Sequence, residues 1–226
     1  MNKNIYTKVV IQLLLSPIIV GALIFLPAGT LNYWQAWVFV AVFYACNVAI
    51  CVWLMIKDPK LLERRMKAGP AAEKEPTQKI IVMFAMLSFA GLGILPALDH
   101  RFGWSDVPTS FVILGNILIA LSYIAFYFVF KENTYGASTI QVEENQKVIS
   151  TGPYALVRHP MYTGALILML GMPLALGSWW GLLLFIPGVA WIIWRLLDEE
   201  RFLSRNLAGY TEYENRVRYH LVPYVW

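Results

Sequence analysis

Six long apolar runs constrain this sequence more than any other feature. They cover residues 9–27, 34–56, 79–97, 108–130, 161–177 and 180–197. Each approaches the ~20 residues that a helix needs to cross a hydrocarbon core ~30 Å thick. With 58% hydrophobic and only 14% charged residues among 226, the chain is too apolar for an ordinary soluble domain. The sequence therefore predicts an all-α, polytopic membrane protein with about six transmembrane helices.

The first run and the last two runs need separate interpretation. Lys3 and Lys8 precede the first run, as in a signal peptide, but the run is long and no small-x-small cleavage site follows it. We expect it to remain as a membrane anchor. The last two runs are short, and only residues 177–179 separate them, which predicts a tight helical hairpin.

The positive charges divide unequally between the two sides of this topology. Six crossings place both termini on one side, and every Lys and Arg except Arg101 falls on that side. The positive-inside rule assigns it to the cytoplasm. The net charge of +4 therefore indicates membrane orientation and basic loops in contact with lipid headgroups, not nucleic-acid binding.

Cys46 and Cys51 both lie in the second run, five positions apart, so they do not share a helix face well. No CxxC motif and no second Cys/His cluster accompanies them. We interpret them as small apolar residues and predict neither a disulfide nor a metal site.

We expect one membrane domain over 1–226, in two parts. Residues 1–130 would form a four-span part, and residues 131–226 a loop, the hairpin and cytoplasmic C-terminal helices. The few polar residues within the first four runs favour hydrogen bonds between helices over substrate contacts. They are chiefly Gln12, Asn47, Ser88, Asn116 and Ser122.

Four segments outside the runs carry further expectations. Segment 66–78 is rich in Ala, Pro and charge, which predicts a flexible connector. Segment 131–160 is long and not of low complexity, which indicates an ordered functional loop. After the last run we expect a helix over 198–207, a break at Gly209 and a second helix over 211–218.

The stretch TGPYALVRHPMYTG, residues 151–164, places polar groups where a transmembrane helix begins. Such groups are costly unless they bind something. Gly152-Pro153 indicates a turn, and Pro160 suits the first turn of a helix. His159 then lies near the N-cap, beside unpaired backbone donors that favour an anion.

A second polar cluster closes the sixth run. Arg195 and Glu199 share a helix face by their spacing, and Glu200 points about 100° away. A stop-transfer end with surface ion pairs is the simplest interpretation. The hairpin, however, returns this cluster to the face of the membrane that holds Arg158 and Tyr162. Together the clusters suit a zwitterionic ligand that meets a lipid-soluble one.

These motifs together resemble a known family. The segment 151–164 is followed by Trp194-Arg195, Glu199-Glu200, Leu203, Gly209, Tyr210, Tyr213, Val217 and Val222-Pro223. This combination resembles the C-terminal half of the isoprenylcysteine carboxyl methyltransferases, whose relatives include membrane phospholipid methyltransferases. Their pattern is Arg-His-Pro-x-Tyr-x-Gly, a helical hairpin, then an Arg and a Glu-Glu pair. The resemblance covers about 75 residues and does not extend to the first four runs.

The resemblance implies an integral-membrane enzyme that uses S-adenosylmethionine at the cytoplasmic face. It places Arg195 and Glu199 near the reacting groups. His159 would hold the cofactor's carboxylate, and Glu200 its ribose hydroxyls or ammonium. The implied cofactor-binding residues are Gly152, Pro153, Tyr154, Val157, His159, Pro160, Tyr162, Gly164, Glu199, Glu200, Tyr210 and Tyr213.

The acceptor stays open at this point. A carboxylate acceptor would need only orientation by Arg195, whereas a thiol or amine would need a base, for which Glu199 is the candidate. Six spans resemble a bacterial, inner-membrane relative, which makes prenylcysteine a doubtful substrate. A small thiol, an amine lipid headgroup and an isoprenoid acid remain possible acceptors.

Two other functions compete with methyl transfer. A membrane reductase of the steroid and sterol type, using NADPH, has a related C-terminal half, but the chain has no GxGxxG motif. A non-enzymatic scaffold or permeation protein is the other alternative. A pore would place polar residues along the first four spans, and those spans are nearly free of them.

Overall fold

The computed structural model describes residues 3–73 and 75–226, and every regular element within these ranges is a helix. Five helical segments are long and apolar enough to cross a membrane. They are α1 (Lys3–Ala28), α2 (Trp34–Lys57), α4 (Pro76–Phe102), α5 (Thr109–Glu132) and the continuous segment formed by η3 (Trp180–Leu184) and α7 (Phe185–Asn206). The all-α, polytopic prediction is confirmed.

The remaining predicted crossing is α6 (Pro160–Ala175), an apolar helix of 16 residues. It is about 24 Å long at 1.5 Å per residue, shorter than a full hydrocarbon core. The predicted hairpin joins it to α7 through Gly177, whose φ of 71° lies in the left-handed region. Ser178 completes the turn, since its hydroxyl accepts a hydrogen bond of 2.9 Å from the Gly181 N–H.

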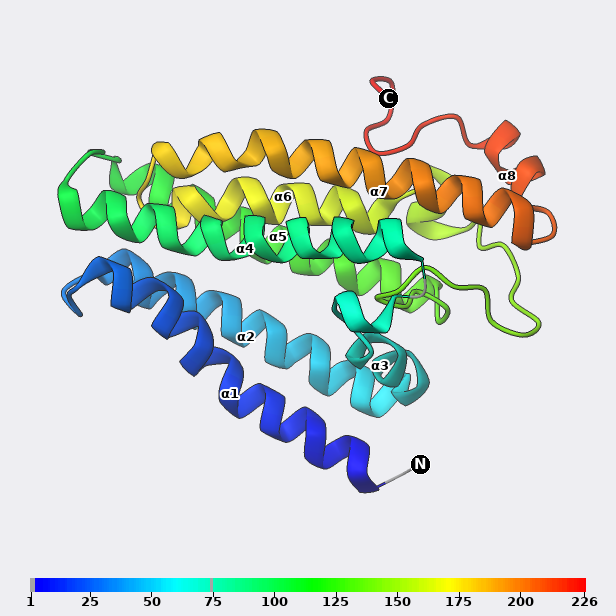
Figure 1. Ribbon diagram of the computed structural model, residues 1–226, viewed down its shortest axis with the longest axis horizontal. Helices are drawn as coiled ribbons and strands as arrows, with labels where there is room; N and C mark the ends of the chain where they lie inside the picture. The colour runs from blue at the N-terminus through cyan, green and yellow to red at the C-terminus, as the bar shows by residue number, and fades with distance from the viewer. Residues whose placement is uncertain (1–2, 74) are drawn as a thin grey trace.

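Different segments lie at the two ends of the helix bundle (Figure 1). The turns α1–α2, α4–α5 and α6–α7 lie at one end. At the other end lie α3 (Pro59–Met66), α8 (Tyr210–Arg216) and the long segment between α5 and α6. We call these the turn end and the site end, because the polar motifs of the sequence gather at the second.

Helices α5 and α6 approach each other very closely. A Cβ atom on Gly115 would lie 2.2 Å from the backbone nitrogen of Ala175. A Cβ atom on Gly164, in the motif, would lie 2.8 Å from the ring of Phe126. Small residues allow this backbone approach in membranes. The contact fixes α6 against α5, and therefore fixes the motif at the start of α6.

The turn end is joined by one buried carboxylate. Asp99, at the end of α4, accepts hydrogen bonds from the Ser105 N–H at 2.7 Å and the Ser105 hydroxyl at 2.6 Å. It also accepts one from the Ser178 hydroxyl at 2.5 Å. We call Asp99, Ser105 and Ser178 the Asp99 cluster. It ties the α4–α5 turn to the hairpin turn.

Two expectations from the sequence need correction. The predicted helix over 198–207 is not separate, because α7 continues without a break to Asn206. Residues 195–206 contain no Gly or Pro that would end it. The break at Gly209 is confirmed, with a φ of 83°, and α8 follows directly.

The second correction concerns segment 66–78, predicted as a flexible connector. It contains the short helix η1 (Pro70–Ala72) and continues into the first turn of α4. Glu73 is only 4% exposed and Gln78 only 1% exposed. These two side chains hold the segment against the protein, because both have partners on α7.

Candidate active site

The loop between α5 and α6 is anchored at both ends by side chains. The Thr151 hydroxyl donates to Glu132 at 2.7 Å, and η2 (Gly152–Ala155) follows. The Asn133 amide donates to the Tyr154 hydroxyl at 2.9 Å. From α8, the Tyr213 hydroxyl donates to the Tyr154 carbonyl at 2.8 Å. Tyr154 is thereby held between the end of α5 and α8.

His159 is the N-cap residue of α6 and Pro160 its first residue, as predicted. The C-terminal tail pairs with the backbone just before this helix. The Arg158 N–H donates to the Tyr219 carbonyl at 2.8 Å, and the His159 N–H donates to the His220 carbonyl at 2.9 Å. Because of this pairing, the position of the Arg-His pair depends on the docked tail.

Glu200 contacts three basic side chains of this region. Its Oε1 lies 2.8 Å from His159 Nε2 and 3.0 Å from Arg158 Nε. Its Oε2 lies 3.4 Å from His220 Nε2. Glu200 is buried, so these charge-assisted contacts are shielded from water. The carboxylate therefore orients the Arg-His pair of the motif and the tail together.

Arg195 is buried and bonded through all three of its nitrogens. Nε donates to the Tyr162 hydroxyl at 3.1 Å, and Nη1 to Gln78 at 2.8 Å. Nη2 donates to Glu73 at 2.9 Å and to the Ser138 carbonyl at 3.0 Å. A buried charge with several bonded partners is a fixed element, and removing a partner is costly. Arg195 thus joins α4, α6, α7 and the loop.

Arg195 and Glu199 meet through Tyr162. The Tyr162 hydroxyl accepts from Arg195 and donates to Glu199 Oε2 at 2.5 Å. Their predicted common face is therefore bridged by a phenol from the motif on α6. The three side chains form a hydrogen-bonded chain that runs from the buried Arg195 and Tyr162 to the partly exposed Glu199 carboxylate.

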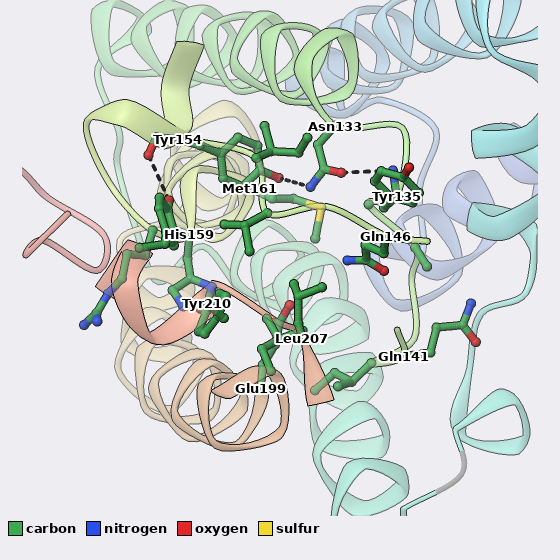
Figure 2. Close-up of a pocket in the computed structure, with 18 of the residues that line it drawn as sticks. Asn133, Tyr135, Gln141, Gln146, Tyr154, His159, Met161, Glu199, Leu207 and Tyr210 are labelled. Atoms are coloured by element: carbon green, nitrogen blue, oxygen red, sulfur yellow. Dashed lines mark hydrogen bonds between the residues drawn. The ribbon is translucent and has the colours of Figure 1, made fainter. Parts of the chain in front are cut away.

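A cavity lies next to Glu199, between the loop, the start of α6, α7 and α8 (Figure 2). Figure 2 shows Asn133 and Tyr135 on one side of it and Glu199 and Leu207 on the opposite side. Its volume, including the open space of its mouth, is ≈ 830 Å³. The predicted site residues that line it are Tyr154, His159, Pro160, Tyr162, Glu199, Tyr210 and Tyr213.

The other predicted site residues do not line this cavity. Arg195 and Glu200 contact residues that do, through the bonds to Tyr162 and His159. Val157 and Gly164 are buried, and Gly164 sets the distance between α6 and α5. Gly152 has a φ of 55°, the left-handed conformation that starts the turn with Pro153 before Tyr154.

The sequence interpretation missed two groups of residues. Asn133, Tyr135, Gln141 and Gln146 line the cavity from the loop, which was expected to be functional but without named residues. Glu73 and Gln78 bind Arg195 from a segment far away in sequence. An isolated acidic residue in an Ala/Pro-rich segment gives no signal of such a partner. Within residues 3–73 and 75–226, no group of three or more His, Cys, Asp or Glu could hold a metal ion.

Burial raises the pKa of three phenols around the cavity, those of Tyr154, Tyr210 and Tyr213. Burial raises the pKa of Tyr154 to about 12. Burial also raises the pKa of Tyr210 and that of Tyr213 well above the ordinary value, and Glu199 adds to the increase at Tyr210. These three hydroxyls therefore stay protonated near pH 7, and that of Tyr213 donates to the Tyr154 carbonyl.

Comparison with known proteins agrees with this geometry. Residues 110–209 match the family model described as phospholipid methyltransferase. Protein-S-isoprenylcysteine O-methyltransferase B of Arabidopsis thaliana is 27% identical over 150 residues, 61% of this chain and 70% of the plant protein. Delta(14)-sterol reductase of Mus musculus is 28% identical over 128 residues, 49% of this chain. The alignment covers only 31% of the reductase.

The family match spans α5, the loop, α6 and α7, the elements that build the cavity. The resemblance drawn from the Arg-His-Pro-x-Tyr-x-Gly motif and the Glu-Glu pair is thereby confirmed. Through residues 110–209, this membrane protein is similar to the phospholipid methyltransferases, and over 150 residues it is similar to an isoprenylcysteine methyltransferase.

Proposed function

We propose that this protein is an S-adenosylmethionine-dependent methyltransferase whose cofactor binds in the cavity at the site end. The observation that carries the proposal is a cavity with a carboxylate on one wall and a paired Arg and His on another. It lies largely within the region that matches membrane methyltransferases. S-adenosylmethionine carries a sulfonium, an ammonium and a carboxylate, which require this separation of charges.

The residues divide into those that contact the ligand and those that position them. Arg158 and His159 line the cavity and would bind the cofactor's carboxylate. Glu199 would face its cationic part, together with the phenol oxygen of Tyr162. Glu200 orients Arg158 and His159, and Arg195 orients Tyr162. When bound, the cofactor supplies an electrophilic methyl group for in-line transfer.

The acceptor would be a lipophilic or small molecule with a carboxylate, thiol or amine. Holding it in line at the cavity supplies most of the catalysis, since positioning can contribute roughly 7–11 kcal/mol. Glu199 would accept a proton from a thiol or amine acceptor. Membrane lipids would be the surroundings and the source of such molecules, and nucleic acid has no role here.

We further propose that the site end and both termini face the cytoplasm, as in a bacterial inner membrane. The Lys and Arg distribution supports this orientation. In this arrangement 1–226 is one methyltransferase domain. Residues 131–226 hold the cofactor, and residues 1–130 supply the membrane part.

Reduction by NADPH is the second candidate, and the similarity to the sterol reductase is the observation that favours it. One titration separates the two functions. We expect saturable calorimetric binding of S-adenosylhomocysteine to the detergent-purified chain, with no heat from NADPH. The reverse result would replace methyl transfer by reduction. Absence of binding by either ligand would reject both.

A further inference from the structure

A second cavity lies among α1, α2, α3 and α5, and of these only α5 falls within the family match. Its volume, including openings, is ≈ 920 Å³. Its wall is mostly apolar but contains several polar side chains, of which Asn47 donates to the Tyr123 hydroxyl at 3.3 Å between α2 and α5. The polar residues on this wall are Gln12, Ser16, Asn47, Cys51, Arg65 and Tyr123.

Arg65 is the only fully charged side chain among the lining residues of this second cavity. Its guanidinium carbon lies 4.4 Å from the centre of the Phe130 ring, and Nη1 donates to the Gly136 carbonyl at 3.1 Å. Within residues 3–73 and 75–226, no carboxylate lies within ion-pair distance of Arg65. Its neighbour Arg64, in contrast, pairs with Glu143 at 3.3 Å. The positive charge on the cavity wall is therefore available to an anion.

The second cavity also has neighbours on both sides. Gln12 and Ser16 line it, and both also line an apolar groove on the outer surface of α1. On the other side, Arg65 Nη1 lies 3.4 Å from the sulfur of Met161, which lines the candidate cofactor cavity. The second cavity therefore lies between two other sites. The groove on α1 adjoins it on one side, and the candidate cofactor cavity adjoins it on the other.

We propose that this second cavity binds a single-tailed or two-tailed amphiphile, with its anionic headgroup at Arg65 and its hydrocarbon chain between α1, α2 and α5. The shared chemistry is an anionic oxygen, carried by a carboxylate or a phosphate. Arg binds both as a planar donor and disfavours a cationic amine. Resting on the proposed function, the inference makes a carboxylate amphiphile the methyl acceptor, with its headgroup beside Met161, whereas a phosphate amphiphile would be a bound lipid.

The first experiment compares ligands on the detergent-purified, full-length chain by native mass spectrometry. The probes are oleate, dioleoyl phosphatidic acid, methyl oleate and oleylamine. We expect the better of the two anions to bind at least about tenfold more tightly than methyl oleate and oleylamine. The tighter anion identifies the source as carboxylate or phosphate. Equal binding of the charged and uncharged C18 probes would overturn the proposal.

The second experiment uses Arg65→Gln, with Lys67→Gln as the matched control. Lys67 is two residues away, exposed and paired only at 3.9 Å with Glu63. Arg65→Gln should remove the preference for the anion, and Lys67→Gln should retain it. A preference that survives in Arg65→Gln would also overturn the proposal.

A third experiment avoids the risk that Arg65→Gln does not fold. A diazirine-bearing C18 fatty acid is cross-linked to the unaltered protein, and the labelled peptides are identified. Labels are expected within 9–16, 47–54 and 62–66, and labels confined to other helices would contradict the site. S-adenosylhomocysteine binding, measured on the same preparations, separates failure of this inference from failure of the proposed function.

Discussion

The two ends of the bundle each bury a carboxylate network, yet only one has the features of an active site. At the turn end, Asp99 is 1% exposed, and donors from two turns satisfy its oxygens. At the site end, the network of Arg195, Tyr162 and Glu199 ends at a cavity. Because both networks contain buried, hydrogen-bonded side chains, these two properties alone do not distinguish a structural network from an active site. The adjoining cavity is what indicates function.

The largest expected effect is on stability at the turn end. Asp99→Ala leaves the Ser105 and Ser178 donors unpaired and should lower the free energy of unfolding by about 3 kcal/mol. Thermal unfolding in detergent measures this. The control is Asp106→Ala, an exposed carboxylate in the same turn. Binding of S-adenosylhomocysteine by the folded fraction should be unchanged, and its loss would end the distinction between the two ends.

Glu199→Gln should affect ligand binding and leave stability nearly unchanged, in contrast to Asp99→Ala. It removes the charge at the cavity but retains a side chain of the same shape, so thermal stability should change little. Binding of S-adenosylhomocysteine should weaken at least about 100-fold, which is about 2.7 kcal/mol. Glu212→Gln, exposed on α8, is the control. Unchanged binding in Glu199→Gln would remove the carboxylate from the proposed site.

Tyr162→Phe tests the bridge between Arg195 and Glu199. It removes one hydroxyl and leaves the ring in place, so Arg195 keeps Glu73 and Gln78 as partners. We expect about a tenfold loss of turnover from misorientation of Glu199, with a smaller change in cofactor binding. Thr163→Val, which breaks a 2.7 Å bond to the Leu221 carbonyl, is the matched change on the same helix. Equal losses in both variants would mean that Tyr162 acts only through packing.

The smallest expected effect is the pH response of the tail. Burial lowers the pKa of His220 below its ordinary value, and Glu200 opposes this only in part. The unfolded chain then binds the proton more readily, so stability falls as pH decreases below about 6.5. His220→Gln should remove this slope, a change in melting temperature of about 2 °C or less. If the melting temperatures of the unaltered protein and of His220→Gln change in parallel between pH 7.5 and 5.5, this role of His220 is contradicted.

The apolar runs 34–56, 108–130 and 161–177 allowed α2, α5 and α6 to be predicted to within two residues, whereas α1, α4 and α7 extend at least five residues beyond their predicted runs. It also allowed the motif residues to be named, since His159, Glu199 and Glu200 follow a family pattern. The partners of Arg195 could not be predicted. Glu73 and Gln78 reach it across more than a hundred residues, and long-range pairing of single polar residues leaves no periodic signal. The unbroken helix α7 was missed because a change to polar composition was interpreted as a boundary.

Because α7 is continuous, it also sets the distance and the rotation between the hairpin turn and the cavity. Residues 185–206 connect the hairpin turn to the cavity without a joint. Successive residues on a helix differ by about 100°, and here Glu199 faces the cavity while Glu200 faces His159. One residue inserted upstream within this helix would place Glu199 where Glu200 now lies, and Asp198 where Glu199 now lies. The register of two adjacent glutamates therefore fixes the length of α7 between the hairpin turn and the cavity.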